Sequence, residues 1–543
     1  MSAAKSPVEQ RIDLLRDLWL EATGDEQARL LVWRIPGNAD RMLAAFFEAH
    51  RQAEEAMTPD FFLNFDCDFD TGFGYSRALL EHFQLGYVGS RDSLKAQGAA
   101  IDWRGAHADH PSSAAGVMDM LGSFAQHYRE HMRSFVAVLV PGAVTSVEAL
   151  QRWLETALQA PVPERVRLCV VDYADSRQWQ PLVERFGKSV RVIDAPIDMF
   201  DIARATAAQS SGGAGPTSAY RQMLTDVMTL LDKGSAAQTA ARAERALQMA
   251  GRQQWPDQQV VLHMAVAGAH LKEKQFPEAI TRYRSARECA LVAETVQHAA
   301  GTHLVMQTWF GEAGVWLTAG QPERAAQAYA QGAEVARRVP NGMFAIEGQR
   351  MAGFCLARAG QPEPARDRYL QGLGEAKAML PADRAMTTLP LLLQDMLRLQ
   401  DATRTEKLEH CAKVYQDEIA QAHQQAETRA AALGARPPAS AITALEAEMG
   451  ATFERSFRKV CDERERLVAG GDEFFRKVVA IGRDFLHPAW NGLPDVKHPL
   501  DKEQPEWDAP PQFAQLPDPS DLLVDDAGGR NRPIPTDTVE SIV

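Results

Sequence analysis

The sequence predicts an α/β N-terminal domain with a mostly parallel sheet, then an all-α solenoid of helical hairpins and a disordered or extended Pro-rich tail. In residues 1–208, short continuous apolar runs alternate with helical patterns, as in strands buried on both faces of a parallel sheet. From about residue 218 the helical periodicity is almost unbroken, and turns recur at similar spacing. A length of 543 residues accommodates these several parts.

Five apolar runs predict the strands of the first domain. They lie at residues 30–35, 61–65, 135–140, 166–171 and 190–193. Apolar residues at helical spacing predict helices over 40–56 and 146–158 between them. The Ser/Gly-rich segment 209–217 then predicts a linker to the helical region.

The loop after the first strand reads Pro36-Gly37-Asn38-Ala39-Asp40-Arg41. The order of strand, loop and helix resembles P-loop nucleotide-binding domains of the signalling-ATPase kind, and Asp172 resembles the acidic strand end that would hold magnesium. A phosphate loop requires several glycines, a Lys and a Ser/Thr, and only Gly37 is present. The resemblance therefore implies a degenerate, structural version of that domain, with a signalling ATPase or switch as an alternative.

An acidic run, Asp66-Cys67-Asp68-Phe69-Asp70, follows the second strand. It resembles the D-x-D opening of haloacid-dehalogenase-like phosphotransferases, which implies Asp66 as nucleophile and Asp68 as acid/base. Asp70 stands where that family has Thr or Val, and no later Lys is identified. The alternative is a solvated acidic loop, and a surface loop is the simplest interpretation of His107 and His110.

Turns between helices are predicted near Gly234, Lys274, Gly320 and Gly360, at separations of 40, 46 and 40 residues. Gly-Gln-Pro-Glu occurs at both 320–323 and 360–363. Gly closes a helix in a left-handed conformation, and Pro suits the first turn of the next helix. These signals predict stacked hairpins over residues 218–400.

Small and aromatic residues recur around these turns. They are the pairs Ala279/Tyr283, Ala325/Tyr329 and Ala365/Tyr369, the small residues Ala286, Gly332 and Gly372, and Ala267, Ala313 and Gly353 in the preceding helices. This pattern resembles tetratricopeptide repeats, although its period is longer than their usual one of about 34 residues. The resemblance implies a solenoid whose first helices line a concave, protein-binding surface.

The candidates for this binding surface lie on the first helices of three hairpins. They are His263, His270, Gln307, Phe310, Glu312, Trp316, Glu347, Arg350 and Phe354. Mixed aromatic and charged side chains suit an extended peptide or a partner helix. The alternative is that about half of the aromatic side chains face a neighbouring repeat.

Two long charged helices and a shorter amphipathic one are predicted over 401–486, as a hairpin that caps the array. The remaining residues, 487–543, form an acidic, Pro-rich tail with too little apolar surface to fold alone. Its apolar anchors are Trp490, Trp507, Phe513, Leu522 and Leu523. These anchors either dock on the body of the same chain or bind a groove on another protein.

Composition narrows the classes of function. A net charge of −14 repels phosphate backbones, so we expect no nucleic-acid partner. Six scattered cysteines predict free thiols, and neither a metal site nor a cofactor motif stands out. No stretch is apolar enough for membrane insertion, so we expect a cytoplasmic protein.

The sequence as a whole predicts a non-enzymatic adaptor or chaperone that holds a protein client on its helical array. By analogy with acidic tetratricopeptide proteins that load secretion machines, including type VI systems, the client would be a secreted effector or a secretion-machine component. The alternatives are the signalling ATPase and a phosphotransferase that uses Asp66 and Asp68.

Overall fold

The computed structural model describes residues 5–50, 57–96, 98, 100–106, 109–160, 163–209, 216–339, 342–433, 437–486, 490, 496, 498 and 511–522. The chain divides into two compact units. The first unit comprises Met1–Thr206 with Gln416–Ser456, and the second comprises Ala207–Tyr415 with Phe457–Val543. The division at 206/207 adjoins the predicted linker, whose residues 210–215 lie outside the described ranges. Residues 416–456 group with the first unit, whereas the sequence analysis assigned them to the hairpin that caps the array.

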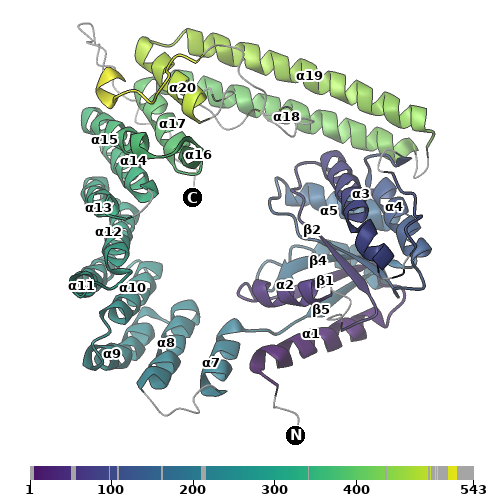
Figure 1. The fold of residues 1–543 in the computed structure, drawn as a ribbon, viewed down its shortest axis with the longest axis horizontal. Coiled ribbons are helices and arrows are strands. Elements are labelled where there is room, and N and C mark those ends of the chain that lie inside the picture. Colours follow the sequence, from purple (N-terminus) through teal and green to yellow (C-terminus); the bar gives the residue numbers. More distant parts are fainter. Residues whose placement is uncertain are drawn as a thin grey trace. The chain divides into compact units, whose positions relative to one another are not determined.

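The first unit contains a five-stranded parallel sheet with the order β2-β3-β4-β1-β5 (Figure 1). The strands are β1 (Leu30–Ile35), β2 (Phe61–Phe65), β3 (Phe135–Leu139), β4 (Val166–Tyr173) and β5 (Val190–Asp194). Each begins at the predicted residue, so the predicted parallel sheet is confirmed. The interior strand β1 pairs with β4 on one side and β5 on the other, and Val32 lies in register between Val170 and Val192.

Helices cover both faces of this sheet. One face packs against α1 (Pro7–Thr23), α2 (Asp40–Ala49) and α7 (Met199–Gln209). The other face packs against α3 (Gly72–Ala96), α4 (Ala114–His127), α5 (Val147–Gln159) and α6 (Gln180–Phe186). Side chains alternate along each strand, so Leu31 and Trp33 lie in the first layer and Leu30 and Val32 in the second. Helix α2 ends at Ala49, and the rest of the predicted helix falls on residues 51–56, outside the described ranges.

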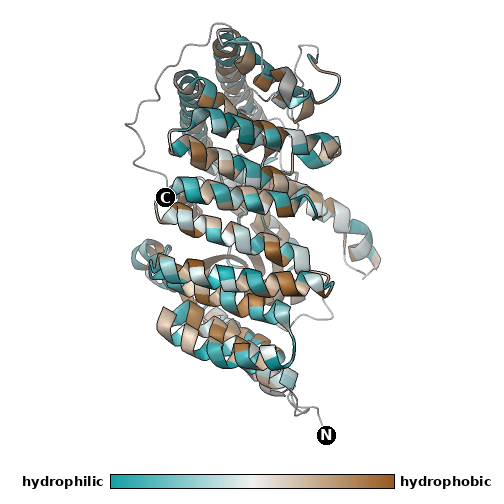
Figure 2. Ribbon diagram, turned by 90° about the vertical axis from the view of Figure 1, so that its left-hand side faces the viewer, coloured by the Kyte–Doolittle hydropathy of each residue, from teal (hydrophilic) through white to brown (hydrophobic). Residues whose placement is uncertain are grey.

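The second unit is a row of helix pairs (Figure 1). Its helices are α8 (Pro216–Lys233), α9 (Ala236–Arg252), α10 (Pro256–Lys272), α11 (Phe276–Thr295), α12 (Gly301–Thr318), α13 (Pro322–Ala336), α14 (Met343–Arg358) and α15 (Pro362–Glu375). Each packs against the next along the chain. Figure 2 views the row from the side of α11, α13 and α15, where hydrophilic and hydrophobic residues are interspersed.

The turns of this array share one backbone geometry. Lys274, Gly320 and Gly360 all have φ between 59° and 73°. After each of them, the next amide donates back to a carbonyl in the last turn of the preceding helix, as Gln321 does to Trp316 at 2.9 Å. Gly234 does not have a positive φ, but the turn predicted near it is present between α8 and α9. Ser235 follows at once and caps α9 through a capping box with Gln238.

Aromatic rings lie directly against glycines where the array helices touch. A Cβ atom added to Gly311 would lie 2.1 Å from the ring of Tyr283, and one added to Gly353 would lie 2.5 Å from the ring of Tyr369. The small residues Ala279, Ala325 and Ala365 are fully buried. The predicted small-residue pattern therefore marks helix contacts.

Five further helices follow the array. They are α16 (Pro381–Arg384), α17 (Leu389–Gln400), α18 (Ala402–Leu433), α19 (Ala439–Ala469) and α20 (Glu473–Phe485). Helices α18 and α19 are the two long helices that the sequence predicts, and each contributes residues to both units. Helix α20 buries Phe475, Val478 and Ile481 in a core with α15 and α17.

The described part of the tail packs on its own unit. Leu522 is fully buried in the core of α15, α17 and α20, and Phe513 and Trp490 pack against that core. Asp484 accepts hydrogen bonds from the backbone amides of Gln512 and Phe513, both at 2.8 Å. Docking on the same chain is therefore the observed state of these three anchors. Trp507 and Leu523 lie outside the described residues.

The shared turn geometry generates a stability prediction. A Cβ atom at Gly320 or at Gly314 would meet no atom within 4 Å, but only Gly320 has a positive φ. We expect Gly320→Ala to lower the free energy of unfolding by about 1 kcal/mol. Gly314→Ala, within α12, should raise it by about 0.5–1 kcal/mol. Urea denaturation followed by circular dichroism measures both, and equal effects would contradict a left-handed turn.

A buried histidine generates a pH prediction. His423 of α18 packs between Phe73 and Phe453, and burial lowers its pKa to about 4 from an ordinary value of 6.5. Below pH 6.5 the unfolded chain binds a proton that the folded chain excludes, so His423 costs stability as the pH falls toward 4.

His423→Phe removes this titration. Relative to the variant, the wild-type chain should lose about 2 kcal/mol of unfolding free energy from about pH 7.5 to about pH 5. The midpoints of urea denaturation of both proteins at several pH values measure this difference. The contributions of the other titrating groups are the same in both proteins and cancel. A difference that does not change with pH would show that His423 is protonated equally in both states.

Candidate functional site

A solvent-open groove of about 1100 Å³ lies along the array. Residues of α11 and α13 line its two sides, α12 forms its floor, and Arg368 of α15 also lines it. The resemblance to tetratricopeptide repeats implied a surface lined by the first helices of the hairpins. Instead, the walls come from second helices, and α12 is the first helix that contributes.

The floor consists of Trp309, Glu312 and Trp316, which share one face of α12. Glu312 is 3% exposed, and its carboxylate forms ion pairs with Arg284, at 3.0 Å, and with Arg287. It also accepts a hydrogen bond of 3.2 Å from the indole of Trp316. This network uses both carboxylate oxygens and fixes the Trp316 ring.

Arg287 does not line the groove itself but contacts two floor residues, Glu312 and Trp309. Its guanidinium lies 3.3 Å from the ring centroid of Trp309, and burial lowers its pKa from the ordinary arginine value. Because Arg287 neutralises Glu312, the buried floor presents little net negative charge. The tryptophan rings are thereby held as apolar surfaces between fixed polar groups.

The walls of the groove carry positive charge. Arg284 is 61% exposed, and Arg324 is also exposed, with its guanidinium 4.7 Å from the ring centroid of Trp316. Arg368 donates only to the amide oxygens of Gln349 and Gln371. In the described part of the chain, neither Arg324 nor Arg368 is paired with a carboxylate. The groove therefore offers two unpaired cations beside two indole rings.

Two of the predicted binding residues, Glu312 and Trp316, lie in this groove. Phe310 instead packs against Gly332 and Phe344, so it holds helices together. Phe354 packs beside Ala325 and Ala326. For these two aromatic residues the structure favours the alternative of facing a neighbouring helix.

The other predicted residues lie outside the groove. Gln307 donates to His303, and His270 lies 2.6 Å from the Gln275 side chain. Arg350 pairs with Glu347 and with Asp395 of α17, which ties two helices together. Burial lowers the pKa of His263 to about 4.

The sequence analysis missed the other groove residues, among them Trp309, Arg284 and Arg324. Trp309 has the i, i+3 and i+7 spacing with Glu312 and Trp316, and that signal could have identified it. The two arginines lie on second helices, which the resemblance to tetratricopeptide repeats assigned to the outside.

Acidic side chains around the loop after β1 are hydrogen-bonded within the protein. Asp40 occupies the first turn of α2 and accepts a hydrogen bond of 3.1 Å from the Tyr173 hydroxyl. Asp172 accepts from the amides of Tyr173 and Gln178, at 3.0 and 2.8 Å, and lies 3.5 Å from Arg34. Both carboxylates, including the one that resembles a magnesium ligand, are therefore used in contacts that hold strand ends and loops together.

The acidic loop after β2 is tied to the loop after β3. Asp68 accepts from the Ala143 amide at 2.8 Å, and Asp70 accepts from the Thr145 hydroxyl at 3.0 Å. Asp68, proposed above as an acid/base, thus has a structural hydrogen bond. Asp66 is exposed and lies near Cys67, whose thiol pKa is raised by burial and by Asp66. His110 lies 3.4 Å from Asp119, and His107 is outside the described residues.

Taken together, these features define a protein with an α/β sheet unit and a helical-hairpin array that carries an aromatic, basic groove. Within the described ranges, no helix combines the length and apolar character needed to cross a bilayer.

No protein-family model and no curated protein matches the sequence. Among solved structures, the crystal structure of a Signal Transduction ATPase with Numerous Domains protein with a tetratricopeptide repeat sensor, from Pyrococcus horikoshii, is similar to this chain. The sequence identity is 10%, the TM-score is 0.21, and the alignment covers 88% of this chain and 91% of that one. This TM-score is too low to carry an inference about fold or function.

The buried network on the groove floor generates a stability prediction. Glu312→Ala leaves Arg287 buried without its partner, so we expect the free energy of unfolding to fall by about 3–5 kcal/mol. Glu288→Ala, at an exposed position of α11, is the matched control and should change it by less than about 0.5 kcal/mol. Urea denaturation measures both. Similar small effects would mean that the Glu312 pair does not hold the floor.

Proposed function

We propose that the protein is a non-enzymatic adaptor that binds an acidic, extended segment of a partner protein in the groove between α11 and α13. The observation that carries the proposal is the pairing of exposed arginines with tryptophan rings in a chain of net charge −14. Arginine and tryptophan are the side chains most often found at energetic hot spots of protein interfaces.

Charge complementarity supports an acidic ligand. Arg324 and Arg368 lack carboxylate partners in the described ranges, and Arg284 remains largely exposed despite its ion pair. A peptide carboxylate can form bidentate hydrogen bonds with such guanidinium groups. Apolar side chains of the same peptide would lie on Trp309 and Trp316, which are already oriented by the floor network. An ordered floor lowers the entropic cost of binding.

The groove also supports binding rather than catalysis. Its one carboxylate, Glu312, is buried and held by Arg284, Arg287 and Trp316. It therefore has little freedom to accept a proton from a substrate. That the client is an exported effector or a secretion-machine component stays a prediction from sequence analogy.

The test is selection of ligands from a displayed library of random linear peptides, followed by fluorescence anisotropy of the selected peptides. We expect enrichment of Asp and Glu beside aromatic or aliphatic residues, and affinities that fall as salt is raised. Arg324→Glu should weaken binding by at least about tenfold, because it reverses a charge in the groove.

Arg358→Glu is the matched control. Arg358 is exposed and lies 5.8 Å from the ring centroid of Phe354, as Arg324 lies over Trp316, but it is outside the groove. Its reversal should leave peptide affinity within about twofold, since exposed charges at a distance are screened. Selection of peptides without acidic residues, or equal effects of the two reversals, would overturn the proposal.

A further inference from the structure

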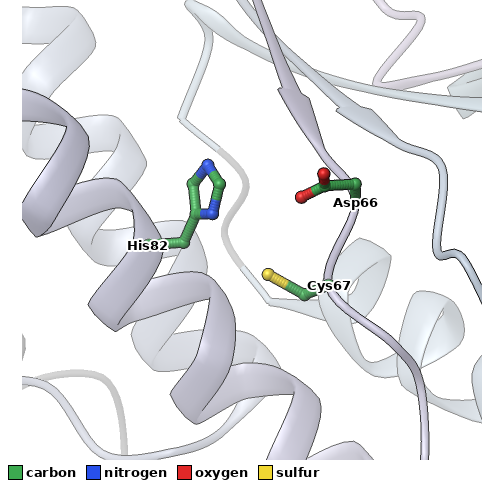
Figure 3. Close-up of side chains that lie close together, drawn as sticks. All are labelled: Asp66, Cys67 and His82. Atoms are coloured by element: carbon green, nitrogen blue, oxygen red, sulfur yellow. The ribbon is translucent and has the colours of Figure 1, made fainter. Parts of the chain in front are cut away.

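Asp66, Cys67 and His82 form a cluster at the carboxyl end of β2. Asp66 and Cys67 directly follow the strand, and His82 projects toward them from α3 (Figure 3). One ligand atom from each residue, namely a carboxylate oxygen, the thiol sulfur and an imidazole nitrogen, lies within 4.8 Å of the other two. The cluster belongs to the first unit and is independent of the groove.

None of the three side chains is engaged elsewhere by a hydrogen bond or an ion pair within the described ranges. The neighbouring carboxylates differ in this respect, because Asp68 and Asp70 are used by Ala143 and Thr145. The loop is thus divided into residues that fix its backbone and residues whose polar atoms remain available. Such a division is what a ligand site requires.

The supports of the cluster are rigid. The bridge between Phe69 and Val144 and the Asp68 hydrogen bond hold the chain that carries Asp66 and Cys67. The ring of His82 lies 5.5 Å from the ring of Phe65, which is 1% exposed. The backbone positions of all three residues are therefore set by the sheet and by α3.

The kinds of donor atom indicate which cation would bind. Thiolate and imidazole favour zinc and other borderline or soft metals, whereas magnesium and calcium prefer oxygen ligands alone. Around a tetrahedral zinc ion, ligand atoms lie about 3.5 Å apart, given bond lengths of about 2.0–2.3 Å. The observed spacing of up to 4.8 Å exceeds that distance by about 1.3 Å, which is within the range of side-chain rotation.

A nucleophilic cysteine is the competing interpretation of the same residues. In such a triad the base lies between the nucleophile and the acid that orients it. Here the acid and the thiol are adjacent in sequence and both face His82 from one side. Carboxylates of Asp66 and Asp68 beside the thiol also favour a cation over a free thiolate.

We propose that Asp66, Cys67 and His82 bind a zinc ion, with water in the remaining coordination position. Binding would join the end of β2 to α3 and release the thiol proton. Three protein ligands leave one position open to an exogenous ligand, unlike a closed structural site of four.

The first experiment uses the untagged wild-type chain, freed of metal by a chelator. Zinc titration should show one ion bound per chain, and zinc should protect Cys67 from alkylation, as read by mass spectrometry. Cys289, which is also half-buried, is the internal control and should react at an unchanged rate. Equal alkylation of Cys67 with and without zinc would overturn the proposal.

The second experiment uses variants. Cys67→Ser and His82→Gln should each weaken zinc binding by at least about tenfold, and Asp66→Asn, at an exposed position, should weaken it less. Cobalt bound to the wild type should show thiolate charge-transfer absorption that Cys67→Ser abolishes. Cys289→Ser is the control variant. If zinc affinity is unchanged in Cys67→Ser and His82→Gln, the ion binds elsewhere and the assignment is wrong.

Discussion

The arrangement of the array depends on aromatic rings that lie against glycine backbones. Tyr283 occupies the space where Gly311 lacks a side chain, and Phe310 occupies the corresponding space at Gly332. A Cβ atom at Gly311 would lie 2.1 Å from the Tyr283 ring and one at Gly332 would lie 2.5 Å from the Phe310 ring, so a side chain at either position would force the ring or the helix to shift. The close approach of α11, α12 and α13 therefore sets the width of the groove.

That packing also determines which residues remain for binding. Phe310 and Tyr283 are used at helix contacts, so the opposite face of α12 presents Trp309, Glu312 and Trp316 to the groove. Burial of Glu312 requires a cation, and Arg287 supplies it from α11. Arg324 and Arg368 are therefore not needed to neutralise a buried carboxylate, and their charge is available to a ligand. The proposed recognition of acidic segments rests on this property.

The features that could be predicted from the sequence are those that local patterns determine. The five strands were found because buried parallel strands are continuous apolar runs, and the turn at Gly320 was found because Gly-Gln-Pro has a specific backbone requirement. The groove walls and His82 were missed because they depend on which helix faces meet. Hairpin periodicity locates helices along the chain, but it does not fix how neighbouring pairs rotate about each other.

Carboxylates follow several strands of the parallel sheet, and they differ in whether other protein groups bind them. After the interior strands β1 and β4, the carboxylates are hydrogen-bonded within the protein, because Asp40 accepts from the Tyr173 hydroxyl and Asp172 accepts from loop amides. At the edge, β2 pairs with β3 alone, and the chain after it is held by the loop after β3 through Asp68 and Phe69. Asp66 and Cys67 in the same segment lie close to His82 of α3. The edge segment thus contains residues that bind the neighbouring loop and residues whose polar atoms remain for a ligand, and the proposed zinc site uses the latter.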